Sequence, residues 1–246
     1  MSLLEVENIS VFYGAVRGVS DISFSVNEGE IIALLGANGA GKSTVLKAIS
    51  GIVRLRSGSI RLSGESLPSG RPHKRVSQGL VQVPEGRHIF ASLTVSENLE
   101  LGGYIHAKSA RARRERQTEV LKLFPNLHDK LNQLAGRLSG GEQQALAIAR
   151  AMMARPRVLM VDEPSLGLDP QKIDVVYDLL ADIARSGTTV VLVEQNVALA
   201  LELAGRAYVL QQGTVVLSGD ATALEKDERV AAAYLGSAPA AAAAVG

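Results

Sequence analysis

Two patterns of apolar residues occur along the chain. In the N-terminal third, apolar side chains recur at every second position, which is the period of strands with one buried and one solvent-facing side. This spacing predicts antiparallel strands near the start of the chain. The positions are Leu4 and Val6, then Ile22, Phe24 and Val26, then Ile60 and Leu62.

Four other segments are apolar almost without interruption, as expected of strands that are buried on both faces of a parallel sheet. The stretch from about Glu97 to Ala154 is rich in Ala, Leu, Arg, Glu and Gln and predicts helices. Together the patterns predict an α/β protein with a parallel sheet and a separate antiparallel part. The four apolar runs are Ile31–Leu35, Leu80–Val83, Val158–Val161 and Val190–Val193.

Composition excludes several classes of function. The chain has 246 residues, of which 46% are hydrophobic, and its 26 basic and 25 acidic residues leave a net charge of +1. This balance disfavours nucleic acid as a partner. The absence of cysteine excludes disulfides and thiolate metal sites. No apolar run approaches the roughly 20 residues of a membrane-spanning helix, and the N-terminus lacks the pattern of a secretory signal.

A glycine-rich loop follows the strand Ile31–Leu35 and leads into the apolar periodicity of a helix. In this setting backbone N–H groups can surround phosphate oxygens, because no Cβ blocks their approach. Lys42 would supply a charge for the outer phosphates, and the Ser43 hydroxyl is suited to ligate Mg²⁺. We therefore predict a P-loop that binds a nucleotide. It reads Gly36-Ala37-Asn38-Gly39-Ala40-Gly41-Lys42-Ser43-Thr44.

Two adjacent carboxylates, Asp162 and Glu163, directly follow the strand Val158–Val161. Ligands of open α/β sheets bind at the carboxyl ends of the strands. We therefore predict that Asp162 holds Mg²⁺, directly or through water, and that Glu163 polarises the water that attacks the γ-phosphate. The alternative is that Glu163 only caps the following turn, but a P-loop in the same sheet favours hydrolysis.

These motifs resemble those of the ATP-binding cassette (ABC) ATPases. The segment from Leu138 to Gln144, which contains Ser139, Gly140, Gly141 and Glu142, is similar to the signature sequence of that family. In the family this sequence caps the γ-phosphate bound by the opposite subunit, so that two chains enclose two ATP molecules. The residues 165–170 resemble the loop that links the two sites. Tyr13 matches the position of the aromatic ring that stacks on adenine.

The resemblance extends from Leu3 to Leu235 and implies a P-loop NTPase fold with a RecA-like parallel sheet core, an antiparallel β subdomain and an inserted helical subdomain. It implies a single ABC ATPase domain over residues 1–236, with the helical subdomain at roughly 86–156. The alanine-rich residues 237–246 are expected to form a disordered tail.

Shorter segments resemble the ATPase subunits of branched-chain amino-acid importers. Such a subunit is peripheral at the cytoplasmic face of the inner membrane. Its partners are integral-membrane permease subunits, a second ABC ATPase in a heterodimer or homodimer, and indirectly a substrate-binding protein. The groove for the membrane subunit is expected near residues 85–93. The segments are Val83–Arg87, Leu93–Leu99, Val193–Asn196 and Ala233–Gly236.

Other functions stay open at this point. The ATPases of urea and short-chain amide importers and of lipopolysaccharide exporters carry similar segments. A soluble ABC ATPase acting on DNA or ribosomes is disfavoured, because this chain has one cassette and no heptad run. A nucleotide-binding module without catalysis is disfavoured by the intact Lys42, Asp162 and Glu163.

Two positions depart from the family pattern. Glu85 stands where most members carry a glutamine that senses Mg²⁺ and the attacking water; a glutamate can still ligate the metal but adds negative charge, for which Arg87 is a candidate partner. Gln195 stands where the family has its switch histidine, and it can donate a hydrogen bond to the γ-phosphate without carrying an imidazolium charge.

The predicted site therefore has three parts. The catalytic residues are Lys42, Glu163 and Gln195, and the Mg²⁺ ligands are Ser43, Glu85 and Asp162. The predicted contacts to ATP are Tyr13, Gly36, Ala37, Asn38, Gly39, Ala40, Gly41, Lys42, Ser43, Thr44, Ser139, Gly140, Gly141 and Glu142.

Overall fold

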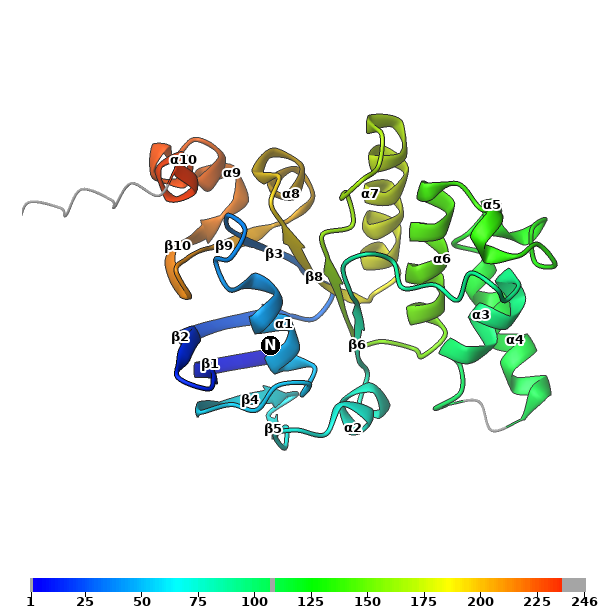
Figure 1. Ribbon diagram of the computed structural model, residues 1–246, viewed down its shortest axis with the longest axis horizontal. Helices are drawn as coiled ribbons and strands as arrows, with labels where there is room; N and C mark the ends of the chain where they lie inside the picture. The colour runs from blue at the N-terminus through cyan, green and yellow to red at the C-terminus, as the bar shows by residue number, and fades with distance from the viewer. Residues whose placement is uncertain (1, 107–108, 236–246) are drawn as a thin grey trace, which may run out of the picture.

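The computed structural model describes residues 2–106 and 109–235, in which the strands form two sheets (Figure 1). An antiparallel sheet has the order β2-β1-β4-β5, and a six-stranded sheet has the order β10-β9-β3-β8-β7-β6. The antiparallel sheet consists of β1 (Ser2–Tyr13), β2 (Val16–Asn27), β4 (Ser57–Leu62) and β5 (Glu65–Ser66). The larger sheet consists of β3 (Ile31–Leu35), β6 (Leu80–Val83), β7 (Val158–Asp162), β8 (Thr189–Glu194), β9 (Arg206–Gln211) and β10 (Thr214–Asp220).

Both strand predictions are confirmed. β1 pairs antiparallel with β2 and β4, and the alternating residues Leu4, Ile22 and Ile60 are buried. The four continuous apolar runs form β3, β6, β7 and β8, which pair in parallel. The sheet also contains β9, parallel to β3, and the antiparallel edge strand β10, neither of which was predicted.

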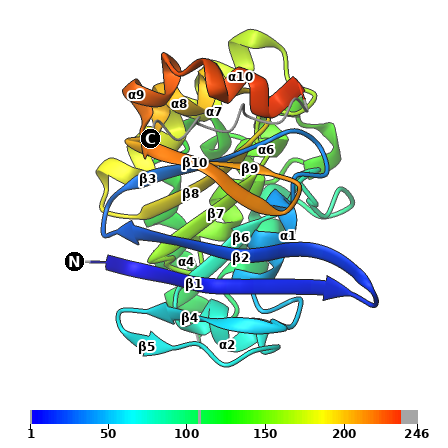
Figure 2. The same ribbon diagram turned by 90° about the vertical axis from the view of Figure 1, so that its left-hand side faces the viewer.

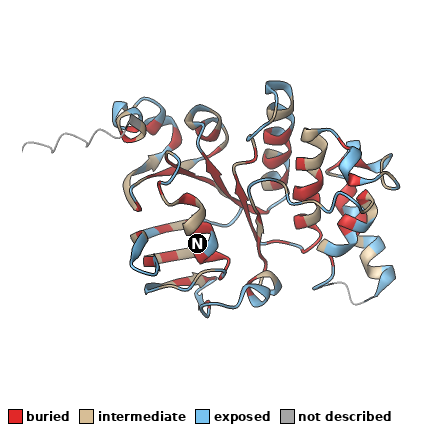
Figure 3. Ribbon diagram, in the orientation of Figure 1, coloured by how far each residue is buried: buried red, intermediate tan, exposed pale blue. Residues whose placement is uncertain are grey.

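Successive residues of the central strands enter two different cores, which explains their unbroken apolar character. On β7, Val158 and Met160 belong to the core shared with α1 and the antiparallel sheet, whereas Leu159 and Val161 belong to the core shared with α6, α7 and α8. Figure 3 shows these strands as the most continuously buried part of the molecule.

The helix α1 (Lys42–Ile49) lies between the two sheets, as Figures 1 and 2 both show. Its apolar residues Val45, Leu46 and Ile49 are fully buried. The opposite face of the six-stranded sheet is covered by α6 (Gly140–Met152), α7 (Pro170–Arg185) and α8 (Val197–Leu203). The chain closes with α9 (Ala221–Glu225) and α10 (Glu228–Leu235), which contact β9 and β10.

Helices dominate the segment between β6 and β7, as predicted. A close contact joins α3 to α6: a Cβ atom built on Gly102 would lie 2.0 Å from the Arg150 carbonyl oxygen, so only glycine allows this approach. The remaining helices are α2 (Pro72–Ser77), α3 (Val95–Gly102), α4 (Ala110–Leu121), α5 (Pro125–His128) and the short 3₁₀ helix η1 (Ala135–Arg137).

Two further points concern the chain as a whole. The predicted tail, residues 237–246, lies outside the described residues. Within the two described ranges, no helix is both long and apolar enough to cross a membrane.

Candidate functional site

The P-loop lies between the carboxyl end of β3 and the start of α1. Gly41 caps α1 with a φ of 105°, a conformation that favours glycine. A Cβ atom at Gly41 would also lie 2.6 Å from Cγ1 of Val19 on β2. The glycines therefore let the loop close tightly over the start of the helix, where backbone N–H groups are available to an anion.

Lys42 and Glu163 meet at the centre of the site. The Lys42 side chain is only 4% exposed, and its Nζ lies 3.2 Å from Glu163 Oε1. The same Nζ donates a hydrogen bond to the Gly36 carbonyl oxygen at 2.7 Å. Glu163 itself adopts a φ of 47°, and its backbone N–H donates to the Val193 carbonyl on β8. Phosphates entering this site would compete with the Glu163 carboxylate for the lysine charge.

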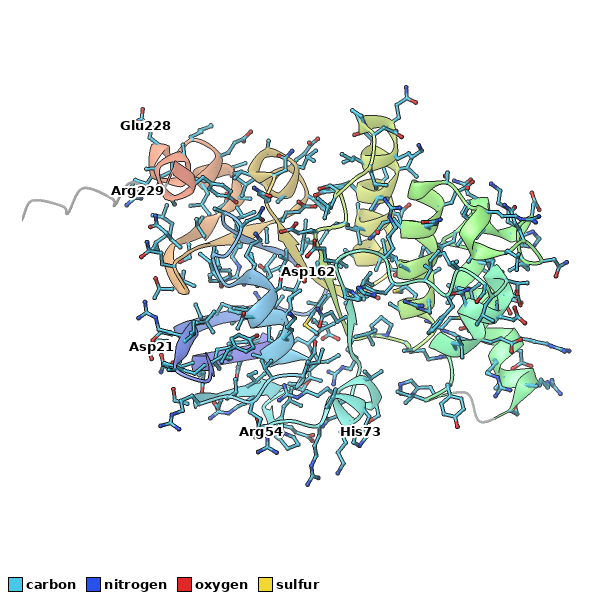
Figure 4. All side chains as sticks on the ribbon, in the orientation of Figure 1. Asp21, Arg54, His73, Asp162, Glu228 and Arg229 are labelled. Carbon is cyan, nitrogen blue, oxygen red and sulfur yellow. The ribbon has the colours of Figure 1, made fainter. Side chains whose placement is uncertain are left out.

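Asp162 lies next to this pair, at the end of β7 near the centre of the molecule (Figure 4). The Ser43 hydroxyl donates to Asp162 Oδ1 at 3.4 Å. Burial raises the pKa of Asp162 to about 6, and the neighbouring carboxylates of Glu163 and Glu85 add to the rise, while Ser43 and Lys42 oppose it.

This donor set fits Mg²⁺. Burial disfavours the ionised form of this carboxylate, and a bound cation would stabilise that form. The adjacent serine hydroxyl offers the cation a second oxygen ligand. The described residues contain no cluster of three or more His, Cys, Asp or Glu side chains able to hold a metal by themselves. Mg²⁺ characteristically takes one or two carboxylates and completes its shell with substrate phosphates and water.

A single cleft of about 480 Å³ brings together most of the predicted P-loop, catalytic and metal-binding residues. Its lining joins residues of the P-loop and α1, residues that follow β6 and β7, and residues at the start of β2. Gln195 enters the cleft from the loop after β8. The lining residues are Arg17, Gly18, Asn38, Gly39, Ala40, Gly41, Lys42, Ser43, Thr44, Glu85, Glu163, Leu166 and Gln195.

Tyr13 and the signature residues lie outside the lining of this cleft. Tyr13 ends β1 with a half-exposed ring, and its hydroxyl lies 3.5 Å from Thr44 Oγ1. Ser139 caps α6 and forms a reciprocal capping box with Glu142, whose carboxylate also pairs with Lys130. The start of α6 is therefore ordered by its own side chains, at a distance from the P-loop of the same chain.

Arg87 was a candidate partner for Glu85, but its guanidinium bonds to other residues. Arg87 donates instead to Gln143 Oε1 and to the Gly167 carbonyl oxygen, both at 3.3 Å. Arg87 and the following His88 have φ values of 66° and 46°, which turn this segment toward α6. No ion pair of Glu85 occurs among the residues that the structure describes.

Two residues near the site were given no role by the sequence argument. The Tyr234 hydroxyl on α10 accepts a hydrogen bond from the Gly36 N–H at 2.7 Å. Glu194, the last residue of β8, is 1% exposed and accepts hydrogen bonds from two backbone N–H groups. The sequence did contain a signal for Glu194, because a carboxylate that directly follows the apolar run Val190–Val193 stands at the carboxyl end of a buried strand. The contact of Tyr234 joins positions 198 residues apart and has no local signal.

Known proteins are similar to the chain over nearly its whole length. A family profile described as ABC transporter matches residues 19–166. The chain is 44% identical to the high-affinity branched-chain amino acid transport ATP-binding protein BraG of Pseudomonas aeruginosa, over 95% of this chain and 100% of that protein. It is 36% identical to the lipopolysaccharide export system ATP-binding protein LptB of Haemophilus influenzae, over 96% of this chain and 98% of that protein.

Solved structures give the same fold. The ADP conformation of MJ1267, an ATP-binding cassette of an ABC transporter, aligns with a TM-score of 0.86 at 24% identity, over 96% of this chain and 99% of that one. A dimeric post-hydrolysis state of the cassette MJ0796, bound to ADP and Pi, aligns with a TM-score of 0.78 at 25% identity, over 89% and 98%. The predicted α/β P-loop fold is therefore confirmed.

Proposed function

The chain belongs to the ATP-binding cassette family of transporter ATPases, and from this premise we propose that it powers the import of branched-chain amino acids. The main support for the ATPase function is that four side chains lie in contact at one end of the sheet: Lys42 with Glu163, and Ser43 with Asp162. The substrate class is supported by the 44% identity to BraG, compared with 36% to LptB.

We assign the residues of the cleft the following roles. The N–H groups of the P-loop hold the phosphates of ATP, and Lys42 turns from Glu163 to the outer phosphates. Ser43 and Asp162, with Glu85 at the edge, would hold Mg²⁺, which supplies positive charge against the phosphate oxygens. Glu163, released from Lys42, accepts a proton from the attacking water, and Gln195 donates a hydrogen bond to the γ-phosphate.

The other predicted contacts to ATP lie outside the cleft, and they would be made to the adenine base or to the ATP of a second chain. Tyr13 offers a half-exposed ring beside Thr44 for stacking on the base. Ser139, Gly140, Gly141 and Glu142 form an ordered helix N-terminus outside the cleft of their own chain. We propose that they cap the γ-phosphate held by a second ABC ATPase subunit, either a homologue or another copy of this chain.

An apolar groove is proposed to receive the membrane subunit at the cytoplasmic face of the inner membrane. It has a volume of about 580 Å³ and lies between β6, α3 and α6. Its rim exposes large apolar side chains, including Phe90 and Tyr104, which single chains seldom leave in one patch. The Arg150 guanidinium lies over the Phe90 ring, 5.3 Å from its centre, and this cation–π contact fixes the ring at one wall of the groove.

The import function is tested by reconstituting the chain with its permease subunits in proteoliposomes and measuring leucine uptake driven by ATP. Phe90→Glu places a charge in the groove and is expected to reduce copurification of the permease about tenfold or more, because the carboxylate would be buried at the interface. Val175→Glu, at a similarly exposed apolar position on α7, is the matched control. Lipopolysaccharide release without leucine uptake would favour the exporter alternative.

Mg²⁺ binding is expected to depend on pH through Asp162. With a pKa of about 6, this carboxyl is mostly ionised at pH 7 and mostly protonated at pH 5, so Mg²⁺ affinity should fall roughly tenfold across that range. Because the folded pKa of about 6 lies above the ordinary value of 3.8, the metal-free protein should lose stability as pH rises from about 4 to about 6. Titration of Mg²⁺ into wild type and Asp162→Asn, which should lack the dependence, checks the first sign, and chemical unfolding of both proteins without Mg²⁺ at several pH values checks the second.

Gln195 is expected to contribute one hydrogen bond to hydrolysis. Gln195→Ala should lower kcat about tenfold, the effect of removing a hydrogen bond to a charged group. Gln195→His should remain active, because an imidazole can donate the same bond. Steady-state hydrolysis measures both variants, and a fully active alanine variant would contradict the assigned role.

A further inference from the structure

The linking loop lies between β7 and α7, at residues 163–169, and is attached to Glu194 through Ser165. Oε1 of Glu194 accepts a hydrogen bond from the Ser165 N–H at 3.2 Å. Its other oxygen, Oε2, accepts from the Gln195 N–H at 3.1 Å. One buried carboxylate thus joins the linking loop to the residue that enters the nucleotide cleft.

Arg87 attaches the same loop on its other side. One of its amino groups donates to the Gly167 carbonyl in the middle of the loop, and the other donates to Oε1 of Gln143 on α6. Gln143 in turn donates to the Leu138 carbonyl just before the signature residues. In Figure 1, α7 stands between α8 and α6, so the loop at its start lies between the two regions that these bonds join.

The burial of Glu194 calls for an explanation beyond strand formation. It continues the apolar run Val190–Val193 and is 1% exposed, where an apolar side chain would be buried without loss. A buried carboxylate is strongly unfavourable unless hydrogen bonds compensate for lost water. The donors at Ser165 and Gln195 are both backbone groups of loops, so the burial of the Glu194 side chain depends on the conformation of these two loops.

A third donor, a side-chain hydroxyl, lies close to Glu194. The Tyr177 hydroxyl on α7 is buried and makes no hydrogen bond of good geometry. Burial raises the pKa of Tyr177, and the Glu194 carboxylate raises it further, which keeps this hydroxyl a donor. The Tyr177 hydroxyl is therefore a further side-chain group beside Glu194 that could donate a hydrogen bond to it.

We propose that Glu194 and Arg87 are positioning residues that hold the linking loop from both sides and make Gln195 and the signature helix α6 of one chain move together. The inference rests on the proposed function, in which Gln195 serves the ATP of its own chain and α6 serves the ATP of the partner chain. The two side chains would then connect the two ATP sites within one subunit.

Enzyme kinetics test this connection through a double-mutant cycle. Glu194→Ala and Arg87→Ala are each expected to lower kcat about tenfold or more, with KM for ATP changed less than threefold. Because both act through one loop, the double variant should be no worse than the poorer single variant. Glu194→Gln, which keeps an acceptor oxygen, and Arg87→Lys should recover part of the rate. Arg185→Ala, which removes an exposed ion pair on α7, is the control.

Amide hydrogen exchange tests the attachment of the linking loop without requiring ATP hydrolysis. Arg87→Ala should speed exchange of the Ser165 and Gln195 N–H groups about tenfold, although Arg87 touches neither residue. Unchanged exchange at both amides, or kinetic effects that multiply in the double variant, would overturn the proposal. A wild-type protein that does not hydrolyse ATP would contradict the proposed function, whereas this exchange measurement would still decide whether Glu194 and Arg87 act as one unit.

Discussion

Replacing Glu163 with glutamine is expected to lower ATP turnover by about two orders of magnitude or more while ATP still binds. The amide is nearly the same size as the carboxylate but cannot accept the proton of the attacking water, and general-base catalysis of this kind contributes roughly 10²- to 10⁴-fold. Single-turnover hydrolysis with saturating ATP and Mg²⁺ measures the chemical step directly.

The ion pair between Lys42 and Glu163 adds a second expectation for the same variant. In the structure, Nζ of Lys42 lies 3.2 Å from Glu163 Oε1, so ATP must displace this carboxylate before the lysine can reach its phosphates. Glu163→Gln removes the competing charge. It should therefore bind ATP more tightly than wild type and, on sizing with ATP and Mg²⁺, should accumulate as a dimer.

Glu85→Gln provides the control, because it removes another carboxylate from the same cleft without removing the proposed base. It should keep most of the turnover. If Glu163→Gln instead hydrolysed ATP at the wild-type rate, Glu163 would only cap the turn after β7, which is the alternative that the sequence left open.

The fold was predictable where one local pattern determined the environment of a strand. Runs such as Val158–Val161 are apolar at every position because successive side chains enter two cores, one on each face of the sheet. β9 carries the same signal, because Ala207–Leu210 is apolar at every position and its side chains alternate between the two cores, but the sequence argument did not use it. Arg206 begins β9 and pairs with Glu30, and β10 is an edge strand that is only partly buried. Their pairing depends on the rest of the sheet.

The centre of the site was predictable because each motif fixes its place at the end of a strand. Lys42 follows β3 and Glu163 follows β7, and β8 is the one strand between β3 and β7 in the sheet. Arg87 was misjudged because its backbone has a positive φ, which directs the side chain to Gln143 and Gly167 instead of to its sequence neighbour Glu85. Arginine has no preference for a positive φ, so the sequence at position 87 does not predict that conformation.

Contacts between distant segments were beyond the sequence argument. Tyr234 bonds to the first residue of the P-loop from the last helix described, and Glu194 bonds to a loop residue 29 positions earlier. Each depends on how α10 or β8 is placed by the whole sheet. The residues proposed to perform the chemistry could thus be placed from motifs, whereas those that hold them in position required the structure.

Removing the ammonium group of Lys42 is expected to weaken ATP binding about 100-fold or more. The side chain is only 4% exposed, so its interaction with a phosphate is weakly screened; two unit charges about 4 Å apart at an effective dielectric constant near 20 interact by about 4 kcal/mol. Lys42→Ala also leaves the Glu163 and Asp162 carboxylates facing the phosphates without compensation. Equilibrium titration with a fluorescent ATP analogue measures the loss, and thermal unfolding checks that the variant is folded.

A double variant separates the two contributions of Lys42. In Lys42→Ala with Glu163→Gln, the unpaired carboxylate is gone but the direct contact to phosphate is still missing. Affinity should recover partly and stay well below that of Glu163→Gln alone, because the Glu163 charge no longer repels ATP but no ammonium group attracts it. Full recovery would mean that Lys42 only neutralises Glu163, and affinity within threefold of wild type in Lys42→Ala would contradict a phosphate contact altogether.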